Sequence, residues 1–218
     1  MLLQLAIDRL EGLSVIRQVA DLVDILEVGT PMLNRFGLAV ISTVRELAPG
    51  VPILVDAKVV DGGTQEAEMV FNAGATLMTV LSSASEATLR AATEVAGKYG
   101  AYVVIDTIGG SADSLPERSA YPERCAWVAL HVSSDARKAG DAHLSAQIST
   151  VTRMHDLGYR VALAGGINRA DLDAAVSVAP EILVIGGAIT NDVDPRGTTE
   201  WMLSQLPDRG RGWSLGMK

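Results

Sequence analysis

Cysteine and aromatic side chains are scarce in this sequence. Cys125 is the one cysteine in 218 residues, so the chain can form neither an internal disulfide nor a cysteine-rich zinc site. We expect Cys125 to be a small buried hydrophobic residue. Aromatic residues make up 4% of the chain, whereas glycine occurs 21 times. Such a composition favours an α/β protein with many tight turns over an all-β sandwich.

The sequence also lacks an excess of positively charged residues and long apolar runs. The chain has 18 Lys and Arg against 26 Asp and Glu, a formal net charge of −8, so it lacks the basic surface that general nucleic-acid binding requires. No window approaches the ~20 apolar residues of a membrane span. The N-terminal segment has no basic region and is interrupted by Asp8. We therefore expect no nucleic-acid partner, no membrane association and a cytoplasmic location.

Short, nearly continuous apolar runs alternate with amphipathic stretches along the chain. The runs are rich in β-branched residues, as expected of parallel strands that are buried on both faces. We predict strands at 2–8, 24–30, 53–59, 76–82, 102–108, 127–133, 160–167 and 182–189. We predict helices at 13–23, 36–48, 64–74, 85–100, 141–158, 170–179 and 194–206. The segment 111–126 has a weaker helical pattern because Pro116 and Pro122 interrupt it.

Eight strand–helix units predict an α/β fold of the closed (β/α)₈ type, the TIM barrel, rather than an open doubly wound sheet. No change of composition divides the chain, so residues 1–207 are expected to form a single barrel domain. The Gly-rich tail, residues 208–218, follows the last predicted helix. We expect a loosely ordered terminus there, with a role at an interface or over the site as the alternative.

Ionisable side chains occur at the ends of five of the eight predicted strands. In a barrel of this type the active site forms at the carboxyl ends of the strands. Burying unpaired charges is unfavourable, so charges that face one barrel mouth must pair with one another or bind a ligand. The candidate residues are Asp8, Glu27, Asp56, Lys58, Asp106 and His131.

Three charged residues interrupt the third predicted strand and the turn after it, in the stretch LVDAKVVDGG (54–63). A period of two places Asp56 and Lys58 on one face, where the carboxylate can keep the lysine charged, relay a proton or bind a cation. Glu27 adds a second carboxylate from the neighbouring strand, and two carboxylates with substrate oxygens and waters commonly hold Mg²⁺. The alternative for Glu27 is an ion pair with Lys58. Asp61 follows the strand and can point out of its own barrel.

Glycine pairs end the seventh and eighth predicted strands, at 165–166 and 186–187. Phosphate sites of such barrels often lie after these two strands, and glycine lets backbone N–H groups approach an anion. The alternative is that both pairs are ordinary tight turns. His131, at the end of strand six, can serve as an acid or base, or it can make a structural hydrogen bond.

Seven segments together resemble the orotidine 5′-phosphate decarboxylase superfamily, in order and at matching spacing over nearly the whole chain. They are LQLAID, DILEVGTP, LVDAKVVDGG, VVIDTI, ALHVSSDARKAG, VALAGGI and VIGGAIT. The most specific feature is the DxKxxD pattern, formed here by Asp56, Lys58 and Asp61. Within the superfamily the chain is similar to the 3-hexulose-6-phosphate synthases.

The resemblance implies a TIM barrel of the ribulose-phosphate-binding type that forms a homodimer with its sites at the dimer interface. Asp61 would cross into the partner's site, and Mg²⁺, or Mn²⁺ in its place, would be held near Glu27 and Asp56. A sugar phosphate would bind against the turns of strands seven and eight. The residues of these turns are Ala164, Gly165, Gly166, Gly186 and Gly187.

The implied activity is that of an aldehyde-lyase, the reversible Mg²⁺-dependent aldol condensation of formaldehyde with D-ribulose 5-phosphate through an enediolate. Lys58 would place positive charge near the developing anion and move a proton, with Asp56 beside it. His131 is the candidate acid or base, and a carboxylate is the alternative for the first proton abstraction. Asp8 and Asp106 would orient substrate hydroxyls.

Two other functions are considered. The 3-keto-L-gulonate 6-phosphate decarboxylases share the fold, metal and enediolate, but carry a glutamate at the end of strand five and an arginine shortly after the strand-six histidine. This chain has Asp106 and a Val-Ser-Ser segment (132–134) there, which favours the synthase, and Arg137 is a displaced substitute. Several relatives also use an arginine for phosphate where this chain has Gly187. A non-catalytic sugar-phosphate-binding paralogue is disfavoured by the number of charges at the mouth.

Overall fold

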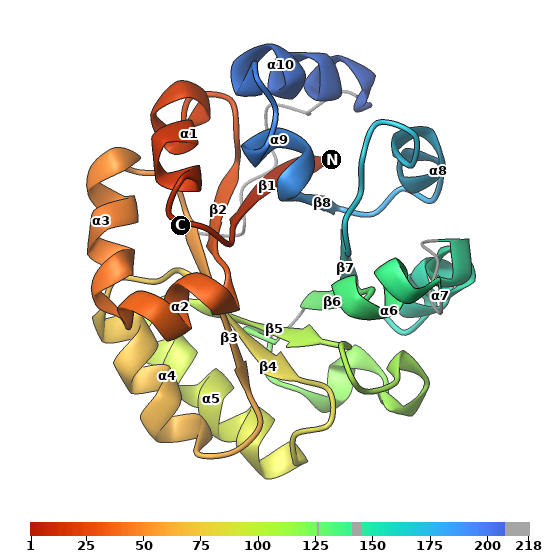
Figure 1. Ribbon diagram of the computed structural model, residues 1–218. Helices are drawn as coiled ribbons and strands as arrows, with labels where there is room; N and C mark the ends of the chain where they lie inside the picture. The colour runs from red at the N-terminus through yellow and green to blue at the C-terminus, as the bar shows by residue number, and fades with distance from the viewer. Residues whose placement is uncertain (126, 141–144, 208–218) are drawn as a thin grey trace.

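The computed structural model describes residues 1–125, 127–140 and 145–207. In this part of the chain eight parallel strands pair in sequence order, and β8 pairs with β1 to close a barrel (Figure 1). The strands are β1 (Leu2–Ile7), β2 (Ile25–Val28), β3 (Ile53–Val59), β4 (Leu77–Leu81), β5 (Tyr102–Asp106), β6 (Trp127–His131), β7 (Arg160–Ala164) and β8 (Ile182–Ile185). Each lies within a predicted run, and the predicted (β/α)₈ fold is confirmed.

Helices surround the barrel on its outside (Figure 1). They are α1 (Gly12–Val19), α2 (Thr30–Phe36), α3 (Ala39–Leu47), α4 (Gly63–Asn72), α5 (Glu86–Tyr99), α6 (Ser134–Ala139), α7 (Ser145–Asp156), α8 (Leu172–Ser177), α9 (Gly187–Thr190) and α10 (Pro195–Gln205). Three short helices, α2, α6 and α9, were not predicted and follow the carboxyl ends of strands. The start of the predicted helix 141–158, at residues 141–144, and the predicted tail 208–218 lie outside the described residues.

The fifth connection departs from the predicted eight strand–helix units. Its described residues, 107–125, form two 3₁₀ turns, η1 (Ala112–Ser114) and η2 (Arg118–Ala120), and no α-helix. Pro116 and Pro122 lack the N–H groups that a helix would use, and each disfavours helical backbone in the residue before it. Leu115, Tyr121 and Cys125 are buried and cover the barrel wall where a helix would otherwise lie.

Side-chain size varies along the inside of the barrel. Ile25, Leu77 and Trp127, the first residues of three alternate strands, are fully buried and fill the amino-terminal end. Farther along the strands the inward residues include four alanines, namely Ala6, Ala129, Ala162 and Ala164. Small side chains leave space in a barrel that is otherwise filled by its own residues, so the carboxyl end stays hollow. None of the helices in the described residues is both long and apolar enough to span a membrane.

Candidate active site

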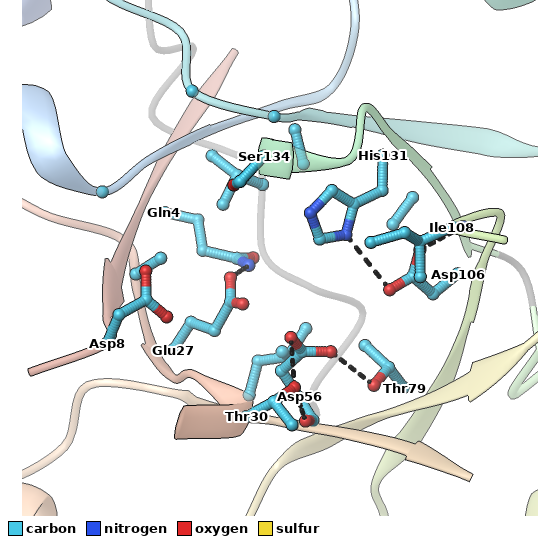
Figure 2. A pocket seen from close by; sticks show the side chains of 18 of the residues that line it. Gln4, Asp8, Glu27, Thr30, Asp56, Thr79, Asp106, Ile108, His131 and Ser134 are labelled. Carbon is cyan, nitrogen blue, oxygen red and sulfur yellow. Dashed lines mark hydrogen bonds and ion pairs between the residues drawn. The ribbon is translucent and has the colours of Figure 1, made fainter. Parts of the chain in front are cut away.

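A cavity of about 770 Å³ lies at the carboxyl end of the barrel, and side chains from all eight strands line it. Figure 2 shows several of its acidic and polar side chains, which converge from different strands. Every predicted site residue except Asp61 lines this cavity. The residues that it brings together are Asp8, Glu27, Asp56, Lys58, Asp106, His131, Ala164, Gly165, Gly166, Gly186 and Gly187.

Four of these residues form a continuous row of ion pairs across the cavity. Lys58 Nζ lies 2.5 Å from Asp56 Oδ2 and 3.2 Å from Asp106 Oδ2. The same Asp106 oxygen lies 3.2 Å from His131 Nδ1 (Figure 2). One ammonium therefore lies between two buried carboxylates, and the imidazole is linked to it through Asp106. Lys58 pairs with these carboxylates, whereas Glu27 bonds to Gln4.

An irregularity in β3 brings Lys58 into this row. Lys58 has a φ of 49°, and the register between β3 and β4 shifts between Val55 and Val59. Positive φ is uncommon for a residue other than glycine, and a bulge of this kind redirects a side chain. The Lys58 N–H donates to Thr79 Oγ1 at 2.9 Å, and Thr79 Oγ1 donates to Asp56 Oδ1 at 2.9 Å. Thr79 of β4 therefore supports both Asp56 and Lys58.

Burial and neighbouring charges act in opposite directions on the pKa values of the row. Burial lowers the pKa of Lys58, but the carboxylates of Asp56 and Asp106 outweigh it and raise that pKa above its ordinary value. Burial raises the pKa of Asp106, but the contacts with His131 and Lys58 hold it below its ordinary value. Burial lowers the pKa of His131, and the hydrogen bond with Asp106 reverses this and raises it. The contacts within the row therefore offset burial and favour the charged forms of Lys58, Asp106 and His131.

Glu27 lies apart from the row and is the most strongly perturbed carboxyl group of the cavity. It is buried, and it accepts a hydrogen bond of 2.6 Å from Gln4 Nε2 (Figure 2). Burial, followed by the charge of Asp56, raises the pKa of Glu27 to about 8. Burial and Asp56 also raise the pKa of Asp8 at the cavity mouth. Burial and mutual repulsion of these carboxyl groups therefore outweigh the positive charges near them.

A divalent cation suits the carboxyl groups of the cavity. In residues 1–125, 127–140 and 145–207, no group of three or more His, Cys, Asp or Glu side chains could hold a metal ion. The raised pKa of Glu27 nevertheless reflects burial first and repulsion from Asp56 second, and a cation beside both carboxylates would oppose these two effects. Gln4 Oε1 is a buried acceptor without a hydrogen-bond partner in the described residues. Mg²⁺ often takes one or two carboxylates and completes its shell with waters and substrate oxygens, and the side chains of Glu27 and Asp56 are compatible with such a donor set.

The glycine turns after β7 and β8 also line the cavity. Gly165 has a φ of 118° and Gly166 a φ of 69°, and a Cβ on Gly165 would lie 2.6 Å from the Val132 carbonyl oxygen. At the other turn, a Cβ on Gly187 would lie 2.9 Å from Asn191 Nδ2. In the described part of the chain, the N–H groups of Gly166 and Gly187 have no backbone acceptor. Donors of this kind can receive an anion.

Two residues singled out in the sequence lie outside the cavity. Asp61 is exposed and does not line it, consistent with a side chain that points out of its own barrel. The guanidinium of Arg137 donates to the Gly165 carbonyl oxygen at 2.8 Å and to Asp171 Oδ2 at 2.6 Å. Arg137 is therefore engaged behind the glycine turn and does not substitute for a cavity arginine.

Sequence reasoning missed several cavity residues. Gln4 and Thr79 lie on strands at inward positions, and Ser133 and Ser134 line the mouth after β6. Gln4, Ala6 and Asp8 alternate along the first strand and therefore lie on the same face of it. A polar residue on the face of the candidate Asp8 could have been predicted to line the cavity. The bond from Thr79 to Asp56 had no such signal, because threonine is common in ordinary strands.

Comparison with known proteins places this chain in a family. The model described as "Orotidine 5'-phosphate decarboxylase / HUMPS family" matches residues 1–201, and the chain belongs to this family. It is 34% identical over 197 residues to 3-hexulose-6-phosphate synthase of Methylomonas aminofaciens. The matched region covers 89% of this chain and 93% of that protein. A crystal structure of 3-hexulose-6-phosphate synthase has a TM-score of 0.87 and 31% identity, covering 95% of this chain and 100% of the other. The 3-hexulose-6-phosphate synthase of Salmonella typhimurium has a TM-score of 0.83 and 33% identity with the same coverage.

Proposed function

We propose that this chain is a 3-hexulose-6-phosphate synthase, an aldehyde-lyase that condenses formaldehyde with D-ribulose 5-phosphate. The observation that carries the proposal is the row Asp56–Lys58–Asp106–His131 inside a cavity whose mouth holds the two glycine turns. The row offers fixed charge and a titratable group to a reacting carbon, and the turns offer backbone donors to a phosphate. Relatives named for this activity, at 31–34% identity, support the same assignment.

The reaction begins with removal of a proton from the carbon beside the ketone of ribulose 5-phosphate. His131 or a carboxylate of the row accepts this proton. The charge of the Lys58 ammonium stabilises the enediolate that forms. The enediolate carbon then attacks the carbonyl carbon of formaldehyde, and the new alkoxide takes up a proton, which gives D-arabino-hex-3-ulose 6-phosphate. Asp8 and Asp106 orient hydroxyl groups of the sugar.

Mg²⁺, or Mn²⁺, is the cofactor of this proposal, with Glu27 and Asp56 as its protein ligands. When bound, it supplies a Lewis acid for the substrate oxygens. The raised pKa of Glu27 supports this assignment, as does Gln4 Oε1, which has no hydrogen-bond partner among the residues that the structure describes. The phosphate would bind to the N–H groups of the turns at Gly165–Gly166 and Gly186–Gly187.

The proposal includes a homodimer whose sites are completed across the interface. Asp61 is a charged residue of the DxKxxD pattern that lies outside its own cavity, so a second barrel is where it would act. Val60 and Met69, from the same β3–α4 unit, are large apolar residues with 54% and 47% exposure. Exposed apolar side chains beside a functional residue are what a partner surface would cover.

The decarboxylase alternative is disfavoured by the position of Arg137. Its guanidinium is bonded to Gly165 and Asp171 and does not line the cavity. Asp106 is occupied as well, because it contacts both Lys58 and His131. The cavity therefore does not present the arginine that the resemblance associates with 3-keto-L-gulonate 6-phosphate decarboxylation.

The test supplies the enzyme with ribulose 5-phosphate and formaldehyde, and separately with 3-keto-L-gulonate 6-phosphate, each with Mg²⁺ or with a chelator. We expect formaldehyde consumption that the chelator abolishes. The Lys58→Ala variant should be inactive, whereas Arg196→Ala should retain activity, because Arg196 does not line the cavity. Carbon dioxide release from the second substrate without reaction of the first would overturn the proposal. Thermal stabilisation by ribulose 5-phosphate without turnover of either substrate would identify a binding protein.

A further inference from the structure

Arg137 of α6 lies next to the glycine turn after β7, and the proposed function assigns it no role. It is partly buried, its side chain being 25% exposed, and its guanidinium makes two directed contacts with the turn after β7. Nη1 donates to the Gly165 carbonyl oxygen at 2.8 Å, and Nη2 donates to Asp171 Oδ2 at 2.6 Å. Asp171 Oδ2 also accepts from the Asn168 N–H at 3.1 Å. Arg137 and Asp171 therefore join both ends of the segment 165–171.

The contact with Gly165 fixes the direction of a peptide group. In a planar trans peptide the C=O of one residue and the N–H of the next point in opposite directions. The Gly165 carbonyl points to Arg137, which lies outside the cavity. The Gly166 N–H therefore points away from Arg137. Because both glycines have positive φ, the turn has little local preference to hold this orientation by itself.

We propose that Arg137 is a positioning residue of the phosphate subsite, holding the Gly165–Gly166 peptide so that its N–H faces the cavity. This inference rests on the proposed function, because it takes the bound anion to be the phosphate of the sugar substrate. Arg137 acts through the turn and does not touch the phosphate. A planar guanidinium suits this role, since it can donate to a carbonyl and a carboxylate at once.

The experiment measures steady-state kinetics of Arg137→Ala and Arg137→Lys with each substrate varied in turn. We expect the KM for ribulose 5-phosphate to rise about tenfold in Arg137→Ala, as the loss of one charge-assisted hydrogen bond would give. The KM for formaldehyde and kcat should change little, and Arg137→Lys should lie between the two. An unchanged KM for ribulose 5-phosphate, or equal losses with both substrates, would overturn the inference.

Arg196 of α10 provides a matched control, because it does not line the cavity. It donates to the Gln18 carbonyl at 2.7 Å and to both carboxylate oxygens of Asp21 at 2.9 Å. Arg196→Ala therefore removes the same kind of double contact away from the cavity. We expect it to leave the KM for ribulose 5-phosphate unchanged. An increase equal to that of Arg137→Ala would mean that general loosening of the barrel explains both.

Asp171→Asn separates positioning from direct binding. If Arg137 acts through the turn, this variant loosens the turn and weakens ribulose 5-phosphate binding, and the double variant with Arg137→Ala shows less than the sum of the two losses. If Arg137 binds phosphate directly, releasing it from Asp171 would tighten binding and contradict the inference. Thermal shifts with inorganic phosphate give the same comparison without turnover. Inactive wild-type protein would therefore refute the proposed function alone, whereas equal phosphate shifts in wild type and Arg137→Ala would refute this inference.

Discussion

Asp106 contacts both Lys58 and His131, and its contact with His131 favours the protonated imidazole. Burial by itself lowers the pKa of His131, and the bond of 3.2 Å with Asp106 raises it above the ordinary 6.5. Asp106→Asn keeps the size of the side chain and removes its charge. We expect the titration midpoint of the His131 ring, followed by NMR, to fall in this variant. A midpoint that stays above 6.5 would mean that Asp56, and not Asp106, supports the imidazolium.

Glu27 predicts how stability and metal binding depend on pH. Its pKa is raised to about 8, so the folded protein retains a proton that the unfolded chain loses near pH 4.5. A raised carboxyl pKa therefore makes the free energy of unfolding fall as pH rises from about 4.5 to about 8. Mg²⁺ must displace this proton, so its apparent affinity should rise by about tenfold per pH unit below 8.

Calorimetric titration of Mg²⁺ between pH 6 and pH 9 measures this dependence. Glu27→Gln serves as the control, because it keeps an oxygen for the Gln4 donor but cannot lose a proton. We expect weak Mg²⁺ binding by that variant, with little change over this range of pH. An affinity of the unmodified protein that is constant below pH 8 would show that Glu27 is not a ligand.

Two glycines in neighbouring helices show how tightly the outer helices pack. A Cβ on Gly63, at the start of α4, would lie 2.3 Å from the Thr88 carbonyl oxygen of α5, whereas one on Gly97 of α5 meets no atom within 4 Å. Gly63→Ala forces the two helices apart and should cost about 1–3 kcal/mol of unfolding free energy. Gly97→Ala should instead add about 0.5–1 kcal/mol, because alanine is the better helix former.

Chemical denaturation of both variants measures the difference. The same methyl group is added at both positions, so helix propensity alone would stabilise both variants. A stabilised Gly63→Ala protein would show that α4 can move away from α5 without loss, and the close approach at Gly63 would then have no energetic role.

The strands of the barrel could be predicted because the apolar residues along each of them indicate that the strand is buried. Runs such as 102–108 are apolar on both faces, as strands between helices and barrel interior must be. The short helices that follow strands could not be predicted. Helices α2 and α6 have seven and six residues, which is too short for a helical periodicity of apolar residues to be recognised. The fifth connection was predicted only as far as its prolines, because the packing of Leu115 and Tyr121 depends on the rest of the fold.

The site was predictable residue by residue but not in its contacts. Charge at strand ends identified Asp56, Lys58, Asp106 and His131, and the rule of the barrel mouth brought them together. The shared oxygen of Asp106 and the bonds of Thr79 depend on the bulge at Lys58. A local register shift of this kind has no signature in a single sequence. The period of two therefore predicted correctly that Asp56 and Lys58 are neighbours, but it did not predict the bulge that brings them together.

The proposed role of Asp61 in a partner's site can be tested only in the assembled dimer. Asp61→Ala should remove most activity while leaving thermal unfolding unchanged, because the side chain is exposed. Lys58→Ala should be inactive because it removes the ammonium from its own cavity.

If sites are shared, a mixed dimer of the two variants has one site that combines intact Lys58 with the partner's intact Asp61. Mixing the two inactive proteins under exchange conditions should therefore restore part of the activity. No recovery in dimers shown to be mixed would contradict the shared site.

The cavity takes residues from every strand, and its last side is built by the pairing of β8 with β1. This pairing joins Leu2 to Ile182, so it spans almost the entire chain and cannot form during synthesis until β8 has been made. Contacts of such separation are also slow to form. A growing chain can therefore bring together the charged row of β3, β5 and β6 before β8 has been made, whereas the cavity is closed only when β8 pairs with β1.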